Sequence, residues 1–215
     1  MRSCPRWVHS YWGQRVCWLA PLVPLVWMTD LTALFWIGLT IAALVFLPTA
    51  RKATFAMVYH NIPVSLLIGA TVGCALSFLI DPWLVPAAEA WTGTTMDLSQ
   101  LHELPGNDGA YIEWLILGLG FGGVWEEVAF RGFFIGWGAV LFGARWALPI
   151  ALLVSVVFGY GHIWQDLAGA IVTGVGGLVF GLTYVFCQRK LLPAIVAHSV
   201  TNFIGITQIY LYGLP

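Results

Sequence analysis

The apolar run from Leu31 to Ala50 is the feature that most limits what this chain can fold into. It contains no Asp, Glu, Lys or Arg, and about 20 apolar residues are what a helix needs to cross the roughly 30 Å hydrocarbon core of a bilayer. Comparable runs cover Ile62–Ile80, Leu167–Cys187 and Leu191–Tyr212. The pattern predicts an integral membrane protein.

The overall charge content points to the same class and excludes others. Only 9% of the 215 residues are charged and 60% are hydrophobic, whereas soluble domains carry about 25% charged residues. The formal net charge is −1, so the chain has no basic surface to neutralise a phosphate backbone. A soluble enzyme, a disordered chain and a nucleic-acid binder are excluded. The expected partners are membrane lipid and a membrane-associated peptide or protein, and no nucleic acid.

The apolar runs predict an all-α fold, a polytopic transmembrane helix bundle with six to seven membrane segments. The first is expected at Val16–Met28 and a later one at Ala147–His162. The run from Ile62 is expected to end at Asp81-Pro82, because proline stops a helix outside its first turn. Residues 1–110 contribute N-terminal membrane helices and an acidic extramembrane loop, and residues 111–215 a helical core, within one integrated membrane domain.

The segment Tyr111–Phe142 is helical in character but too long for a single span. Its 32 residues reach about 48 Å at a rise of about 1.5 Å each. We expect a break or bend near Gly132, Gly136 or Gly138.

Small residues also predict close helix packing. Gly118, Gly120 and Gly123 spell GxGxxG, but no strand precedes them, so a packing face is favoured over a dinucleotide site. Gly177 and Gly181 have the same spacing as a GxxxG packing motif.

Basic residues in short loops predict the orientation, because they favour the cytoplasmic side. Arg51-Lys52, Arg145 and Arg189-Lys190 all fall on one side if each segment crosses once, and the acidic stretch 87–110 falls on the other. We expect a cytoplasmic N-terminus, in the plasma (inner) membrane of a prokaryote.

The most unusual polar cluster is Glu126-Glu127-Val128-Ala129-Phe130-Arg131, in the middle of an apolar run. A charge there costs at least about 2.5–3.5 kcal/mol on insertion scales. Glu127 and Arg131 are four residues apart and can pair on a helix. Glu126 points about 100° away and has no partner on its own helix, which suits a general base. The alternative is that all three form one buried ion network that joins two helices.

Two further clusters bring histidines into apolar segments. His162 follows Phe158 by one helical turn, and His198 and Asn202 share a helix face, where they offer an imidazole nitrogen and an amide NH₂ to a common point. Taken alone, His162 is typical of a residue at the membrane–water interface. The His198/Asn202 pair alone is typical of hydrogen bonds between membrane helices. Because polar groups inside a bilayer need water or protein partners, these histidines and the glutamates together predict a water-filled cavity.

These motifs, in this order on successive segments, resemble the type II CAAX prenyl endopeptidase and bacteriocin-processing family of intramembrane proteases, the CPBP or Abi family. The resemblance covers about Tyr111 to the C-terminus and implies hydrolysis of a peptide bond in a membrane-associated substrate, for which a prenylated CAAX-type protein is one candidate. It implies that Glu126 activates water with help from His162, and that His198 and Asn202 stabilise the oxyanion. The supporting residues are Glu127, Arg131 and Phe158.

The resemblance implies two schemes that compete for the same residues. In one, the glutamate works without a metal. In the other, one zinc ion is bound by Glu126, His162 and His198, with the fourth position open. Two other functions remain as alternatives: a proton-coupled transporter or channel, in which these residues form a relay, and a non-catalytic immunity or scaffold member of the family.

Overall fold

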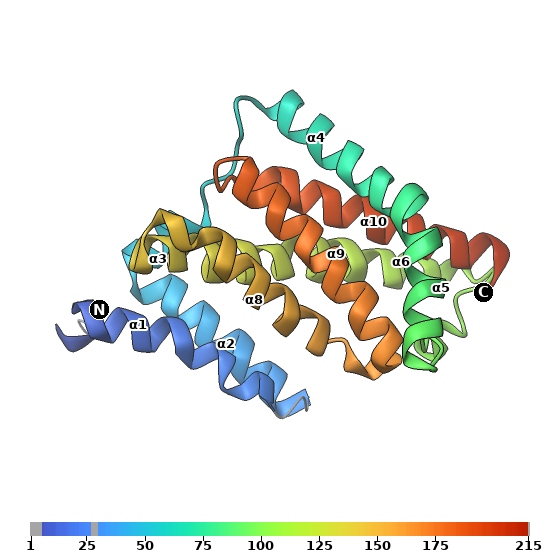
Figure 1. Ribbon diagram of the computed structural model, residues 1–215, viewed down its shortest axis with the longest axis horizontal. Helices are drawn as coiled ribbons and strands as arrows, with labels where there is room; N and C mark the ends of the chain where they lie inside the picture. Colours follow the sequence, from blue (N-terminus) through green and yellow to red (C-terminus); the bar gives the residue numbers. More distant parts are fainter. Residues whose placement is uncertain (1–5, 27–29, 215) are drawn as a thin grey trace.

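A computed structural model describes residues 6–26 and 30–214, and all of the described elements are helices (Figure 1). Here η marks a 3₁₀- or π-helix. The elements are η1 (Arg6–His9), α1 (Tyr11–Leu19), η2 (Ala20–Leu22), η3 (Pro24–Val26), α2 (Asp30–Phe46), α3 (Pro48–Thr54), α4 (Ile62–Ala75), η4 (Leu76–Ile80), α5 (Asp81–Thr92), η5 (Ser99–Leu101), α6 (Asp108–Ile116), η6 (Leu117–Trp137), α7 (Gly138–Phe142), η7 (Ala144–Trp146), α8 (Ala147–Tyr160), η8 (Ile163–Gln165), α9 (Asp166–Phe186) and α10 (Leu191–Tyr212).

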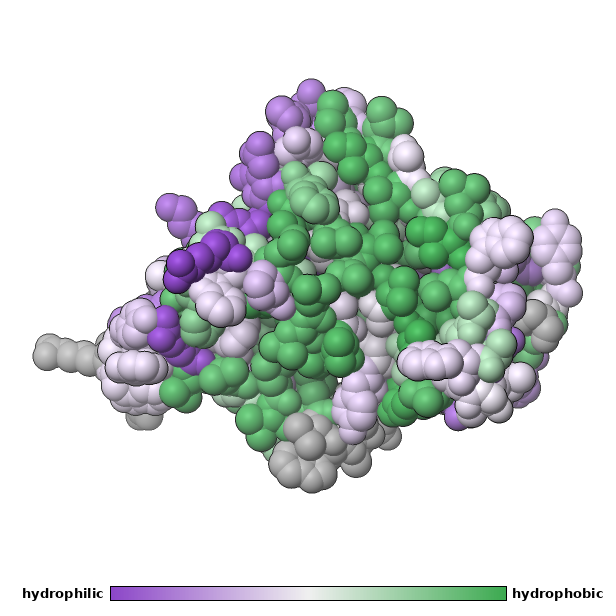
Figure 2. Space-filling model, in the orientation of Figure 1, coloured by the Kyte–Doolittle hydropathy of each residue, from purple (hydrophilic) through white to green (hydrophobic). Residues whose placement is uncertain are grey.

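The helices that carry the polar motifs form the centre of the bundle. α10 packs against both α4 and η6, and α8 packs along α9 (Figure 1). The fully buried side chains include several large aromatic ones, among them Phe133, Phe134, Trp137 and Tyr184. The outer surface is also apolar: Figure 2 shows hydrophobic residues covering the middle of one face, which is what a lipid-exposed bundle requires. The all-α membrane fold is therefore confirmed.

Fewer helices than expected are long and apolar enough to cross a bilayer. Within the described part of the chain these are Ile62–Thr92, Ile163–Phe186 and Leu191–Tyr212, with Leu31–Thr54 as a fourth if its two bent halves count as one span. The expectation of six to seven segments is not confirmed. The predicted helices at 147–162, 167–187 and 191–212 are present with nearly the expected bounds.

The run Leu31–Ala50 is not one straight helix. α2 ends at Phe46, and α3 begins at Pro48 with a bend of 105° between Leu31–Phe46 and Pro48–Thr54. Leu47 is extended, with φ −112° and ψ 101°. The cause is local, because a residue that precedes proline is sterically pushed out of the helical region.

The expected helix end at Asp81-Pro82 is wrong. The helix continues from Ile62 to Thr92, where Gly93 ends it in a left-handed conformation. The chain passes the proline by adopting a π-helical stretch over Leu76–Ile80, so that Pro82 falls in the first turn of α5, where its missing N–H costs nothing.

The expected break in Tyr111–Phe142 is also absent. Helix is continuous from Asp108 to Phe142, and Gly132, Gly136 and Gly138 lie within it. Residues Leu117–Trp137 are π-helical, a geometry that is frequent at functional sites.

The expected first membrane segment, Val16–Met28, is not a spanning helix over the residues described. α1 ends at Leu19 and is followed by two short 3₁₀ turns, since prolines at positions 21 and 24 interrupt the helix. Trp27 and Met28 lie outside the described residues.

Several glycines allow helices to approach closely, as the sequence predicted. A Cβ at Gly118 would lie 2.6 Å from Ile206 Cδ1, and one at Gly177 would lie 2.7 Å from Phe158 Cδ1. One at Gly123 would collide with Ser199. Gly120 has no atom within 4 Å, and Gly181 meets only ordinary contacts at 3.6 Å, so the packing role was wrong for these two.

The contact between α8 and α9 gives a stability prediction. A Cβ at Gly159 would lie 2.5 Å from the carbonyl oxygen of Ala170, whereas a Cβ at Gly174 on the facing helix would meet its nearest atoms at 3.5 Å. Gly159→Ala should therefore lower the unfolding free energy by about 1–3 kcal/mol through overpacking. Gly174→Ala should be neutral or stabilising by up to about 1 kcal/mol. Unfolding of the detergent-solubilised variants tests this, and equal stability of the two would contradict the packing described.

Candidate active site

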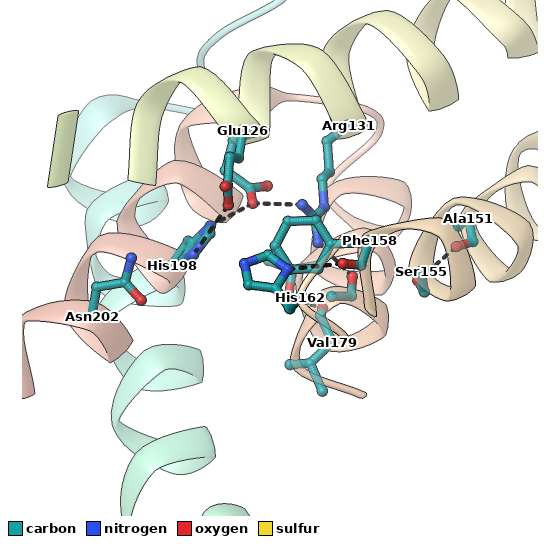
Figure 3. Close-up of polar contacts among 12 residues, drawn as sticks. Glu126, Arg131, Ala151, Ser155, Phe158, His162, Val179, His198 and Asn202 are labelled. Carbon is teal, nitrogen blue, oxygen red and sulfur yellow. Dashed lines mark hydrogen bonds and ion pairs between the residues drawn. The ribbon is translucent and has the colours of Figure 1, made fainter. Parts of the chain in front are cut away.

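The three polar motifs converge on one place inside the bundle (Figure 3). η6 supplies Glu126, α10 supplies His198, and the end of α8 supplies His162. Glu126 Oε2 and His198 Nε2 are 4.0 Å apart, and both side chains are largely buried, with 13% and 7% exposure. A carboxylate and an imidazole from distant parts of the chain thus face each other.

Glu127 is the most completely buried polar residue of the site and has two partners. Its Oε1 lies 2.8 Å from Arg131 Nη1 and 2.9 Å from His198 Nδ1. The predicted pairing of Glu127 with Arg131 is present. The contact with His198 was not predicted, because it joins two helices 71 positions apart in sequence. Glu127 therefore both neutralises Arg131 and orients the imidazole.

Arg131 extends the same network to α9. Its Nη2 donates a hydrogen bond of 2.7 Å to the carbonyl oxygen of Gly177. Its guanidinium also lies 4.7 Å from the ring centroid of Phe158 and 5.5 Å from that of Phe180, distances at which cation–π attraction operates. A charge that is only 1% exposed is thus surrounded by compensating groups.

The hydrogen-bond pattern defines the tautomer of His198. Because Glu127 is paired with Arg131 and an ionised carboxylate only accepts hydrogen bonds, His198 Nδ1 is the donor in its contact with Glu127 Oε1. In the neutral ring, Nε2 then carries a lone pair directed toward Glu126. Only the imidazolium donates from both nitrogens. The ring is held in place by Phe180, which stacks on it at 4.6 Å, and by the edge of Phe158 at 6.0 Å.

His162 is positioned by Phe158, as the spacing predicted. Its Nδ1 donates a hydrogen bond of 2.9 Å to the Phe158 carbonyl oxygen, and the two rings are 4.8 Å apart. With Nδ1 as donor, the neutral ring has its lone pair on Nε2. Phe158 contacts both His162 and His198, so this ring links the two imidazoles.

Asn202 lies on the same face of α10 as His198, but its amide already has one partner. Nδ2 donates a hydrogen bond of 2.8 Å to the carbonyl oxygen of Gly118. A Cβ at Gly122 would lie 2.6 Å from that nitrogen and 3.7 Å from His198 Nε2. The amide carries two N–H bonds, so one remains for another acceptor.

Gly122 and Phe180 belong to the site but were not predicted from the sequence. Only Gly122 could have been recognised, from its spacing. Gly118, Gly122 and Glu126 recur every fourth residue, and His198 and Asn202 have the same spacing on α10. Two such faces fit together when the small residues of one meet the polar side chains of the other. Phe180 lies within an apolar helix, where no pattern distinguishes it.

The three residues proposed as zinc ligands, Glu126, His162 and His198, are not drawn together around one point in this arrangement. Among the described residues, no three or more His, Cys, Asp or Glu side chains are grouped so as to hold an ion. His198 Nδ1 is bound to Glu127, and His162 Nδ1 to a backbone carbonyl. Both contacts use Nδ1 and leave Nε2 available, which is the arrangement common in metal-ligating histidines. The zinc scheme and the metal-free scheme therefore both stay predictions.

Comparison with known proteins supports the resemblance seen in the motifs. Residues 108–204 match the family model described as type II CAAX prenyl endopeptidase Rce1-like. Neither the curated proteins nor the solved structures give a significant match to this chain. The matched residues make up just under half of the 215 and include all of the predicted site residues. Over residues 108–204 the chain is therefore similar to the type II CAAX prenyl endopeptidase Rce1-like family, in agreement with the resemblance of the three motifs.

Proposed function

We propose that this protein is an intramembrane endopeptidase that hydrolyses a peptide bond with a water molecule activated by Glu126. The observation that carries the proposal is the 4.0 Å approach of Glu126 Oε2 to His198 Nε2, inside a helix bundle with a lipid-exposed surface. The family match at residues 108–204 indicates a CAAX-type intramembrane protease, and the chemistry proposed here is a finer statement of that activity.

Glu126 acts as the general base. Its carboxylate takes one proton from water, and the resulting hydroxide attacks the carbonyl carbon of the scissile peptide bond. The tetrahedral intermediate collapses when the C–N bond breaks, and the departing nitrogen receives the proton that Glu126 holds. His162 assists by presenting the lone pair of Nε2 toward the bound water.

His198 and Asn202 stabilise the oxyanion that forms on the carbonyl oxygen. Asn202 donates through the N–H that is not used by Gly118, and His198 donates from Nε2 as the imidazolium. Fixed donors of this kind are worth most where water is scarce. Glu127 and Arg131 are positioning residues in this scheme, since they act on the reacting atoms through His198.

The substrate we propose is a membrane-associated peptide or protein, with a prenylated C-terminal CAAX segment as the first candidate. It is supported by the family match and by a site enclosed by helices with apolar outer faces. We also propose that the N-terminus faces the cytoplasm of a prokaryote and that the protein lies in its plasma (inner) membrane, on the distribution of basic residues.

The proposed mechanism is tested first by Glu126→Gln, which keeps the size of the side chain and removes the base. Cleavage of a farnesylated CAAX peptide by the purified protein in detergent should fall about 10²–10⁴-fold in kcat. Glu113→Gln is the matched control, because Glu113 lies on the same long helix but is exposed; it should leave the rate unchanged.

Two outcomes would contradict this proposal. One is full retention of cleavage in Glu126→Gln. The other is a wild-type protein that cleaves neither the farnesylated peptide nor its unmodified form, but carries an electrogenic proton flux in liposomes that Glu126→Gln abolishes. That second result would favour the transporter or channel alternative.

A further prediction concerns whether cleavage depends on a metal ion. Because the proposed chemistry uses Glu126 and the histidines without a metal, wild-type protein treated with EDTA and then freed of the chelator should cleave the same peptide at an unchanged rate. Metal content is measured in parallel by mass spectrometry. A loss of activity that zinc restores, with one zinc bound per chain and lost in His198→Ala, would replace the proposed oxyanion role of His198 with metal ligation.

A further inference from the structure

A cavity of about 460 Å³ lies in the corner made by α2, α3 and η6. It exists because the chain turns by 105° between α2 and α3. The corner is bounded by Leu44 on α2, Arg51 on α3 and Trp125 on η6. Trp125 directly precedes Glu126 in sequence, but their side chains point to different parts of the bundle. Trp125 lines the cavity, whereas Glu126 faces His198 on α10. The cavity is therefore separate from the candidate active site.

The cavity opens toward the lipid side of the protein. Four of its lining residues are apolar and substantially exposed: Ile41 by 45%, Val45 by 57%, Phe55 by 47% and Val124 by 45%. In a bilayer these side chains meet hydrocarbon. A ligand that enters from this side comes from the membrane and presents an apolar chain.

The polar groups at the cavity only donate hydrogen bonds. Of the lining side chains, Arg51 and Trp125 alone have nitrogen or oxygen atoms, and neither side chain has an acceptor. The indole nitrogen of Trp125 is buried and has no hydrogen-bond partner among the described residues, and the same holds for Trp36, whose ring lies 6.1 Å from that of Trp125. Both nitrogens are shielded within the helix packing, so the guanidinium of Arg51 is the polar side-chain group that a ligand in the cavity can reach.

The charged end of the cavity lies where lipid headgroups are expected. Arg51 is followed by Lys52, and backbone hydrogen bonds from Leu191 to Ala56 and from Leu192 to Met57 bring the Arg189-Lys190 turn to the same end of the bundle. In Figure 1 the turn between α9 and α10 lies near α3. Clusters of basic residues at a membrane face attract anionic lipids.

We propose that this cavity binds an anionic phospholipid. One acyl chain fills the corner between α2 and η6, and the phosphate accepts hydrogen bonds from Arg51. Arg51 Nη1 already donates to the carbonyl oxygens of Leu44 and Val45, which fixes the guanidinium at the mouth. A guanidinium has five N–H donors, so others remain for the phosphate. The bound lipid supports η6, the helix that carries Glu126.

The test is lipid binding to the full chain in detergent, measured by native mass spectrometry during titration with phosphatidylglycerol or phosphatidylcholine. The wild type should retain phosphatidylglycerol in preference to phosphatidylcholine. Arg51→Gln should weaken phosphatidylglycerol binding about fivefold, the effect of one basic residue at an anionic surface. Lys52→Gln, which removes the neighbouring charge but does not line the cavity, should weaken binding less than Arg51→Gln does.

A second pair of variants tests the cavity without changing charge. Val45→Trp fills the cavity and should abolish the preference for phosphatidylglycerol, whereas Leu39→Trp, on an exposed part of α2 outside the lining, should keep it. This pair still tests the proposal if Arg51→Gln does not fold because its hydrogen bonds to the end of α2 are lost.

Three results would overturn the proposal. The first is equal weakening by Arg51→Gln and Lys52→Gln, which would indicate general surface attraction. The second is unchanged binding in Val45→Trp. The third is displacement of phosphatidylglycerol by a farnesylated peptide at equimolar concentration, which would assign the cavity to a protein substrate.

Discussion

The carboxylate of Glu127, shared between Arg131 and His198, is the contact on which the rest of the site depends. One oxygen lies 2.8 Å from Arg131 Nη1, as an ion pair, and 2.9 Å from His198 Nδ1. All three side chains are at most 7% exposed. Removing one member of a buried ion pair typically costs about 3–5 kcal/mol, because a charge is left without compensation. The pairing therefore dictates how η6 and α10 pack.

Several features of the site follow from that contact. With Nδ1 committed to Glu127, His198 turns Nε2 toward Glu126, and the stacked ring of Phe180 prevents it from rotating away. Arg131 also fixes the position of α9, because it donates a hydrogen bond to the carbonyl oxygen of Gly177. The bare Cα atoms of Gly118 and Gly122 let α10 approach closely enough for Asn202 to reach a backbone carbonyl. The reacting groups are thus held by packing as well as by charge.

The sequence predicted what depends on spacing within one helix and missed what depends on contacts between helices. The Glu127–Arg131 pair and the contact of Phe158 with His162 follow from four-residue spacing, and both are present. The Glu127–His198 bond joins distant segments, so no local pattern reveals it. The bend at Leu47 was predictable from the proline that follows it, whereas the passage of a helix through Pro82 required a π-helical turn that composition does not indicate. The six to seven expected spans are not confirmed, because bends and short helices divide several of the apolar runs in the described part of the chain.

The protonation pattern of His198 tests the central claim most directly. In protein labelled with ¹⁵N at histidine and solubilised in detergent, NMR should show His198 with a proton on Nδ1 and with that proton in a hydrogen bond. The signal should persist in Glu126→Gln and shift in Glu127→Gln, since only Glu127 accepts from Nδ1. A neutral His198 with its proton on Nε2 alone, or an Nδ1 signal that is unaffected by Glu127→Gln, would contradict the account.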